Sequence, residues 1–194
     1  MTTPRHFLKL ADFTGEELNH MLDRAIKIKK DLKAGKPYEP FHGKTLAMIF
    51  EKASTRTRVS FESGFYQLGG NVIHMTTQGS QLGRSESIED TARVISRMVD
   101  LVMIRTFGQD RLDAFASHSL VPVINGLTNE YHPTQMLADL LTIKEVFGDY
   151  KGRKLAYFGD ARYNIGNSLC IVCSKLGLNL TLCAPEKYFP SKDL

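Results

Sequence analysis

Residues 45–58 constrain the fold of this chain more than any other segment. The run TLAMIF, at Thr45–Phe50, is almost wholly apolar, which is typical of a strand buried in a parallel sheet. Residues 59–68 then carry apolar side chains at helical spacings, and Gly69-Gly70 is a helix-ending signal. Three hydroxyls and two guanidiniums lie between strand and helix, at residues 54–58. This order predicts a strand, a polar loop and a helix that begins at the loop.

The polar loop has the chemistry of an anion site. A helix start presents free backbone N–H groups and the positive end of the helix dipole, which favour bound anions. Hydroxyl groups add neutral donors, and an arginine fork matches the oxygens of a phosphate. An ordinary helix cap with two solvated arginines is the alternative interpretation. Because the whole cluster follows a buried strand, Ser54–Thr57 is interpreted as a phosphate cradle.

The rest of the chain alternates short apolar runs with amphipathic segments. The predicted strands are 45–50, 71–75, 101–104, 121–124, 154–158 and 178–183. The predicted helices are 14–35, 59–70, 87–99, 110–117 and 133–148, and a further helix that follows the 160–167 loop and ends at Gly177. Thr14 and Glu17 are spaced as a capping box, and Asn125-Gly126 is expected to close the fourth strand. The pattern predicts an α/β fold, a parallel sheet with helices on both faces, followed by the start of a second α/β domain.

Composition excludes several classes of protein. Hydrophobic residues make up 42% of the 194, and charged residues 24%, as in ordinary globular proteins. No apolar stretch approaches the roughly 20 residues that span a bilayer, and residues 1–6 lack the apolar region of a signal peptide. Three cysteines, an odd number, favour a reducing cytoplasm over a disulfide framework. The net charge of +4 is modest, and the lysines of residues 27–36 indicate a solvated helix face, so neither a membrane nor a nucleic acid is expected as partner.

Three separated motifs resemble one known family. Ser54–Arg58 followed by Ser60-Phe61-Glu62, then Ser80–Gly83, then His132–Gln135 match, in order, motifs of the aspartate and ornithine carbamoyltransferase family. The resemblance extends from about Phe7 to the last residue. It implies a carbamoyl-phosphate-binding domain at 1–132, an interdomain helix at 133–148, and the beginning of an ornithine-binding domain at 149–194. Helix 14–35 would pack beside the sheet of the first domain.

The resemblance also implies a reaction and the residues that perform it. A carbamoyl group would pass from carbamoyl phosphate to an uncharged amine, and phosphate would leave. The residues that match the phosphate-binding positions are Ser54, Thr55, Arg56 and Thr57. Thr57 would also reach the carbonyl oxygen, Arg105 would bridge the phosphate and the carbonyl, and His132 would donate to the carbonyl oxygen. Gln135 would contact the carbamoyl amino group. The resemblance thus implies that Arg105, His132 and Thr57 are the catalytic residues.

Two further positions bear on the acceptor amine and on assembly. Gln81 lies on a polar loop that, in the family, enters the site of a neighbouring subunit, which implies a homotrimer or a higher homo-oligomer. The loop lacks the lysine of the aspartate enzymes, and its Gln-Leu-Gly matches the ornithine enzymes. Asn164 matches an asparagine that binds the amino-acid portion of ornithine, although the asparagine often found beside it is here Tyr163. The implied products are L-citrulline and phosphate, in arginine biosynthesis.

Alternatives to this function remain open from the sequence. The acceptor could be another amine such as putrescine, or the chain could be an inactive remnant that binds carbamoyl phosphate. Two family segments, a serine-methionine-glycine stretch and a histidine-cysteine-leucine-proline stretch, do not occur here, so we expect the chain to hold the first portion of such an enzyme and to turn over ornithine poorly by itself. Cys170 and Cys173 have metal-ligand spacing, but they lie in an apolar helix with no second pair, and no metal or organic cofactor is expected.

Overall fold

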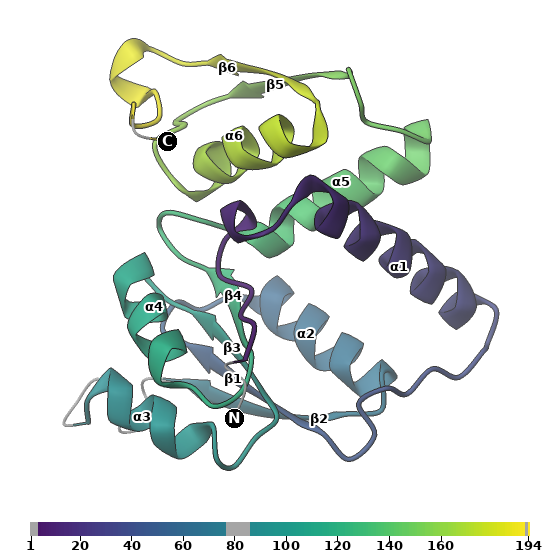
Figure 1. The fold of residues 1–194 in the computed structure, drawn as a ribbon, viewed down its shortest axis with the longest axis vertical. Helices are drawn as coiled ribbons and strands as arrows, with labels where there is room; N and C mark the ends of the chain where they lie inside the picture. Colours follow the sequence, from purple (N-terminus) through teal and green to yellow (C-terminus); the bar gives the residue numbers. More distant parts are fainter. Residues whose placement is uncertain (1–3, 77–85, 193) are drawn as a thin grey trace. The chain divides into compact units, whose positions relative to one another are not determined.

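Four parallel strands form the sheet of the first part of the chain. They are β1 (Thr45–Phe50), β2 (Asn71–Thr76), β3 (Leu101–Arg105) and β4 (Val123–Leu127), in the order β2-β1-β3-β4 (Figure 1). The computed structural model describes residues 4–76, 86–192 and 194. The parallel pairing confirms the predicted α/β fold. The strand order reverses between β1 and β3, and ligands of open α/β sheets bind at the carboxyl ends of the strands at such a point.

Helices cover both faces of this sheet. On one face, α3 (Ile88–Ile95) and α4 (Gln109–His118) pack on the alternate residues Ala47, Ile49, Val102, Ile104 and Val123. On the other face, α2 (Thr55–Gln67) packs through Phe65 against a cluster that includes Leu46, Met48, Phe50 and Met103. Because the side chains of a strand alternate between faces, each central strand is apolar on both sides. This explains the uninterrupted run TLAMIF that the sequence shows at β1.

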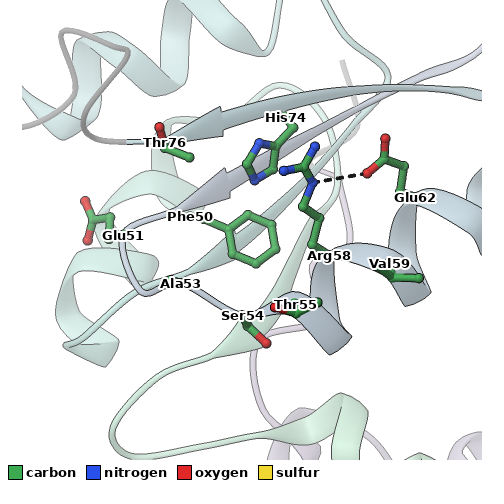
Figure 2. Close-up of a pocket in the computed structure, with 10 residues that line it drawn as sticks. All are labelled: Phe50, Glu51, Ala53, Ser54, Thr55, Arg58, Val59, Glu62, His74 and Thr76. Atoms are coloured by element: carbon green, nitrogen blue, oxygen red, sulfur yellow. Dashed lines mark hydrogen bonds and ion pairs between the residues drawn. The ribbon is translucent and has the colours of Figure 1, made fainter.

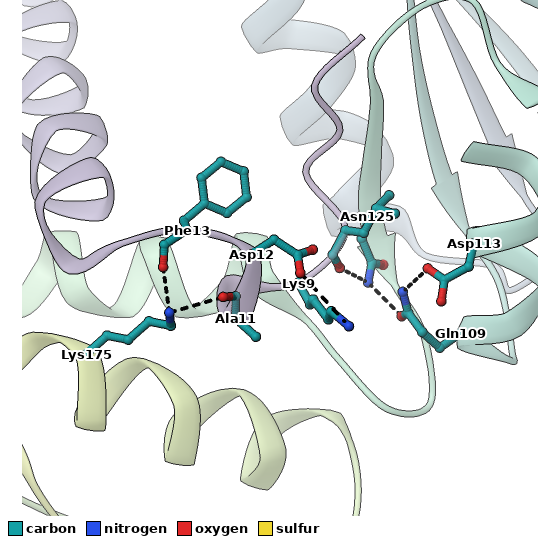
Figure 3. Close-up of polar contacts among 9 residues, drawn as sticks. Lys9, Ala11, Asp12, Phe13, Gln109, Asp113, Asn125 and Lys175 are labelled. Atoms are coloured by element: carbon teal, nitrogen blue, oxygen red, sulfur yellow. Dashed lines mark hydrogen bonds and ion pairs between the residues drawn. The ribbon is translucent and has the colours of Figure 1, made fainter. Parts of the chain in front are cut away.

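Strand β4 extends beyond the point predicted from the sequence. The prediction ended this strand at residue 124 and expected Asn125-Gly126 to close it, whereas β4 continues to Leu127. The fully buried Asn125 amide donates to the Leu8 carbonyl at 2.8 Å (Figure 3), and the N–H of Thr106 donates to the Leu127 carbonyl at 3.0 Å. Long-range hydrogen bonds of the Asn125 amide nitrogen and of Leu127 therefore hold in the sheet a segment that would locally favour a turn.

Two helix bounds also differ from the prediction. Helix α3 ends at Ile95, not near residue 99, because the chain tightens into three-residue turns in which the N–H groups of Arg97 and Met98 donate to Val94 and Ile95. Helix α2 starts at Thr55, four residues before the apolar periodicity begins, because Ser54 caps it. The phosphate-cradle sequence therefore forms the first turn of this helix.

The second part of the chain is built from three helices and two strands. The chain divides into two compact units. The first contains the four-stranded sheet and consists of Met1–Leu8 and Pro37–Thr128, and the second consists of Lys9–Lys36 and Asn129–Leu194. In the second unit, three helices pack on one another, namely α1 (Gly15–Lys33), α5 (Pro133–Phe147) and α6 (Asn164–Leu176). Strand β5 (Lys154–Phe158) pairs there in parallel with β6 (Asn179–Cys183). The unit also contains two short 3₁₀ helices, η1 (Leu10–Asp12) and η2 (Glu186–Tyr188).

Helix α1 is fixed at its N-terminal end by two polar devices. The predicted capping box is confirmed: the Glu17 N–H donates to Thr14 Oγ1 at 3.2 Å, and the Thr14 N–H donates to Glu17 Oε2 at 2.9 Å. Lys175 at the end of α6 donates to the carbonyls of Phe13 and Ala11 at 2.6 and 3.1 Å (Figure 3). Helix α1 thus belongs to the same unit as α5 and α6, which are its packing partners there.

Candidate functional site

The candidate site lies at the carboxyl ends of β1 and β3, where the strand order reverses. The loop after β1 leads through Ser54 into α2, and Arg105 is the last residue of β3. Phe50 and Arg105 pair across the two strands, and the Glu51 N–H donates to the Arg105 carbonyl at 2.9 Å. The sheet thus brings together residues that are about fifty positions apart in the chain.

Ser54 and Thr57 close the first turn of α2. The Thr57 N–H donates to Ser54 Oγ at 3.3 Å, and Ser54 Oγ donates to Thr57 Oγ1 at 3.0 Å. Ser54 has extended backbone angles, as a helix cap requires. The N–H groups of Thr55 and Arg56 lie in the first turn, where no helical carbonyl can accept them. The turn can therefore offer two N–H groups and two hydroxyls to an anion.

Arg105 joins this turn from the neighbouring strand. Its Nη1 donates to Thr57 Oγ1 at 3.4 Å, whereas its buried Nε has no hydrogen-bond partner in the part of the chain that the structure describes. Burial lowers the pKa of the Arg105 guanidinium, but an arginine keeps its proton in a protein. A half-buried cation with an unsatisfied N–H is costly unless an acceptor reaches it, so an oxyanion would complete its contacts.

The other charges around the turn differ in how they are balanced. Arg56 is exposed and forms no ion pair with any described residue. Arg58 Nε pairs with Glu62 Oε2 at 3.3 Å along α2. The Glu51 carboxylate, which the sequence reasoning did not single out, accepts from Arg111 on α4. Uncompensated positive charge therefore remains on Arg56 and Arg105, two of the residues that the sequence assigned to phosphate.

A pocket of about 620 Å³ opens beside the same turn. Ser54 and Thr55 line it together with Phe50, His74 and the Arg58–Glu62 pair (Figure 2). Burial and the charge of Arg58 lower the pKa of His74, so this imidazole is neutral near pH 7, and its ring centroid lies 5.1 Å from that of Phe50. The pocket is much larger than a phosphate group and extends from the turn along α2.

The remaining predicted site residues fall in the second unit or outside the described residues. His132 is the residue before α5, its N–H donates to Ser168 Oγ at 3.0 Å, and its Nδ1 lies 3.3 Å from Thr134 Oγ1. Gln135 donates to Asp139 at 2.9 Å within α5. Asn164 is the first residue of α6. Gln81 lies outside the residues that the structure describes.

The Cys-x-x-Cys pair lies within α6. Cys173 is 2% exposed, and burial raises the pKa of its thiol to about 11; Cys170 is partly buried, and its thiol pKa is also raised by burial. Both thiols are therefore protonated near neutral pH and are weak nucleophiles. Within the described ranges, no three His, Cys, Asp or Glu side chains gather as a metal site, and no helix there is long and apolar enough to cross a membrane.

Comparisons with known proteins were made for both sequence and structure. Residues 5–145 match the family model "Aspartate/ornithine carbamoyltransferase, carbamoyl-P binding domain". An ornithine carbamoyltransferase from Bordetella avium is 57% identical, over 95% of this chain, and a catabolic ornithine carbamoyltransferase from Treponema denticola is 51% identical, over 98%. The structure of the Burkholderia thailandensis ornithine carbamoyltransferase is similar with a TM-score of 0.91, at 50% identity over 95% of this chain and 63% of that chain. This chain spans 58% of the length of the first relative and 56% of the second.

Proposed function

Because this chain belongs to the aspartate/ornithine carbamoyltransferase family, we propose that its protein transfers the carbamoyl group of carbamoyl phosphate to the side-chain amine of L-ornithine. The products are L-citrulline and phosphate. The relatives compared above are named for the ornithine reaction, which supports ornithine over aspartate as the acceptor.

One observation carries the proposal: an unsatisfied arginine beside a helix start. The first turn of α2 offers N–H groups and hydroxyls, and Arg105 is bonded to that turn while its Nε lacks an acceptor among the described residues. Carbamoyl phosphate supplies phosphate oxygens for the turn and a carbonyl oxygen for the arginine. Hydrogen-bond donors that are already in position when charge develops in the transition state usually make the largest single contribution to catalysis.

Each predicted residue has a role in this proposal. The phosphate binds to Ser54, Thr55, Arg56 and Thr57. Arg105 bridges the phosphate and the carbonyl oxygen, and Thr57 and His132 also donate to that oxygen as negative charge grows there. Gln135 accepts from the carbamoyl amino group, Asn164 holds the amino-acid portion of ornithine, and Gln81 reaches the site of a neighbouring subunit.

The wider setting of the enzyme is proposed on the same grounds. We assign carbamoyl-phosphate binding to residues 1–132, the link between domains to the helix at 133–148, and ornithine binding to a domain that begins at residue 149. The three free cysteines suit a cytoplasmic enzyme, and arginine biosynthesis is the proposed role.

Product identity tests the reaction. In the full-length protein, we expect ornithine-dependent release of phosphate with one citrulline for each phosphate, and no carbamoyl-aspartate when aspartate replaces ornithine. His132→Ala should lower kcat by roughly 100-fold or more, as loss of one oxyanion donor does in other enzymes. Carbamoylation of putrescine in preference to ornithine, or of aspartate, would contradict the proposal.

Self-association is the second expectation. Three apolar side chains are exposed on α2 and on the edge strand β2, Val59 (55%), Tyr66 (78%) and Ile73 (48%), and such surfaces often mark subunit contacts. We expect sedimentation velocity to show a trimer or a larger closed assembly, and Tyr66→Glu to shift it toward monomer. The matched control is Leu120→Glu, at an exposed leucine after α4. Monomer alone across the micromolar range would contradict the assembly and the role of Gln81.

A further inference from the structure

Glu51 occupies an unexpected position for a carboxylate. It is the first residue after β1, three positions before the phosphate turn, and it lines the same pocket as Ser54 and Thr55 (Figure 2). Its side chain is only 9% exposed. A buried negative charge at this place should repel a phosphate dianion, because charges are screened less inside a protein than in water. The charge therefore needs a partner for the turn to bind an anion.

Arg111 supplies that partner from α4. Its Nε and Nη2 both lie 2.7 Å from Glu51 Oε1, and Thr106 Oγ1 donates to the other carboxylate oxygen. Both oxygens of the Glu51 carboxylate therefore accept hydrogen bonds from neighbouring residues. The positive charge of Arg111 therefore balances the negative charge of Glu51 next to the proposed site.

The same contacts tie together the elements that build the site. Glu51 belongs to the loop after β1, and its N–H donates to the Arg105 carbonyl. Thr106 follows Arg105, is fully buried, and donates its own N–H to Leu127 at the end of β4. One carboxylate thus connects the loop, the end of β3 and helix α4 across the point where the strand order reverses.

We propose that Arg111 is a positioning residue of the phosphate site: it neutralises Glu51 so that a phosphate dianion can bind to Ser54–Thr57, and through Glu51 it holds the loop against Arg105. This inference rests on the proposed function, since it assigns a residue to the same site. Arg111 acts through Glu51 and needs no contact with the substrate.

Charge and hydrogen bonding at position 111 can be separated by two substitutions. In Arg111→Gln the amide can still donate to Glu51, but the positive charge is gone, whereas Arg111→Lys keeps the charge and loses the fork. We expect Arg111→Gln to weaken binding of inorganic phosphate by roughly tenfold, a value that allows for the solvent exposure of Arg111. Arg111→Lys should stay within about threefold of the unchanged protein.

Removal of both charges gives the sharpest test. In the Glu51→Gln/Arg111→Gln double variant no carboxylate remains to repel phosphate, so affinity should return to within about threefold of the unchanged protein. A role confined to folding would predict a double variant no better than Arg111→Gln. The matched control is Arg93→Ala, which breaks an exposed ion pair of 2.8 Å on α3 and should leave phosphate affinity unchanged.

Calorimetric titration of the 194-residue chain with inorganic phosphate is the measurement, and thermal melting of each variant confirms folding. Equal affinities in Arg111→Gln, Arg111→Lys and the unchanged protein would overturn the inference and leave the proposed function standing. Absence of phosphate binding in the unchanged protein would instead contradict the cradle itself. If Arg111→Gln fails to fold, the double variant alone tests the inference. A loss of phosphate affinity of tenfold or more in the double variant, relative to the unchanged protein, would also overturn it.

Discussion

Replacing Arg105 with alanine should weaken binding of a phosphonate analogue of carbamoyl phosphate by about 2–3 kcal/mol, or roughly 30- to 150-fold. Arg105 lies at the end of β3, its Nη1 donates to Thr57, and its buried Nε has no partner among the described residues. The substitution removes a charge-assisted fork that the ligand would occupy. Calorimetry of the two proteins with the same analogue gives the difference directly.

The stability of the same variant separates a binding role from a structural one. Alanine at position 105 removes a half-buried cation that is incompletely paired without ligand, so the unfolding temperature of the free protein should stay the same or rise. Added analogue should stabilise the unchanged protein and not Arg105→Ala. Arg93→Ala serves as the arginine control. Unchanged affinity in Arg105→Ala would remove this residue from the site, and a large loss of stability would assign it to the fold.

Alanine at Gly166 should destabilise the protein by about 1–3 kcal/mol, because the added methyl overpacks a closed contact. A Cβ at this position would lie 2.2 Å from the Ala161 carbonyl oxygen and 2.5 Å from its Cα, so backbone has to move. The affected loop precedes Asn164, the proposed ornithine contact at the start of α6. Urea unfolding measures the change in free energy.

Gly64 provides a matched control for this prediction. It also lies inside a helix, but apart from its chain neighbours and the nearby backbone of its own helix, no atom of the described residues lies within 4 Å of the position its Cβ would occupy. Gly64→Ala should therefore raise stability by about 0.5–1 kcal/mol, the usual gain in helix propensity. Opposite signs for the two variants are expected. A Gly166→Ala protein as stable as Gly64→Ala would show that the 161–166 contact can relax without loss.

Local signals predicted most of the elements that build the site. The strand at Thr45–Phe50 has the bounds expected from sequence, because a strand buried on both faces leaves an uninterrupted apolar pattern. The strand at Lys154–Phe158 also has its predicted bounds, although its residues alternate between exposed and partly buried. The Thr14 capping box is likewise a local device. Strand β4 was misjudged because its Asn-Gly pair resembles a turn, whereas the Asn125 amide donates to Leu8, which lies far away in the chain.

The candidate site was predictable in part. Ser54 and Thr57 are close in sequence, and the structure brings Arg105 to them through a strand order that no pattern in the chain reveals. Glu51 was missed because its partner Arg111 is 60 residues away, and a lone glutamate after a strand carries no signal of its own. Long-range pairing of charges is a property of the folded topology, so only the structure discloses it.

The phosphate turn itself can be observed by NMR titration of the ¹⁵N-labelled chain with inorganic phosphate. We expect saturable shifts of the backbone N–H signals of Thr55 and Arg56 and of the Arg105 Nε–H signal, which gains its missing acceptor. The Arg58 Nε–H signal, already bonded to Glu62, should move little. Saturation of these three signals with one affinity is the result that the proposed site predicts. Shifts confined to other surfaces, or an unmoved Arg105 signal at saturating phosphate, would contradict it.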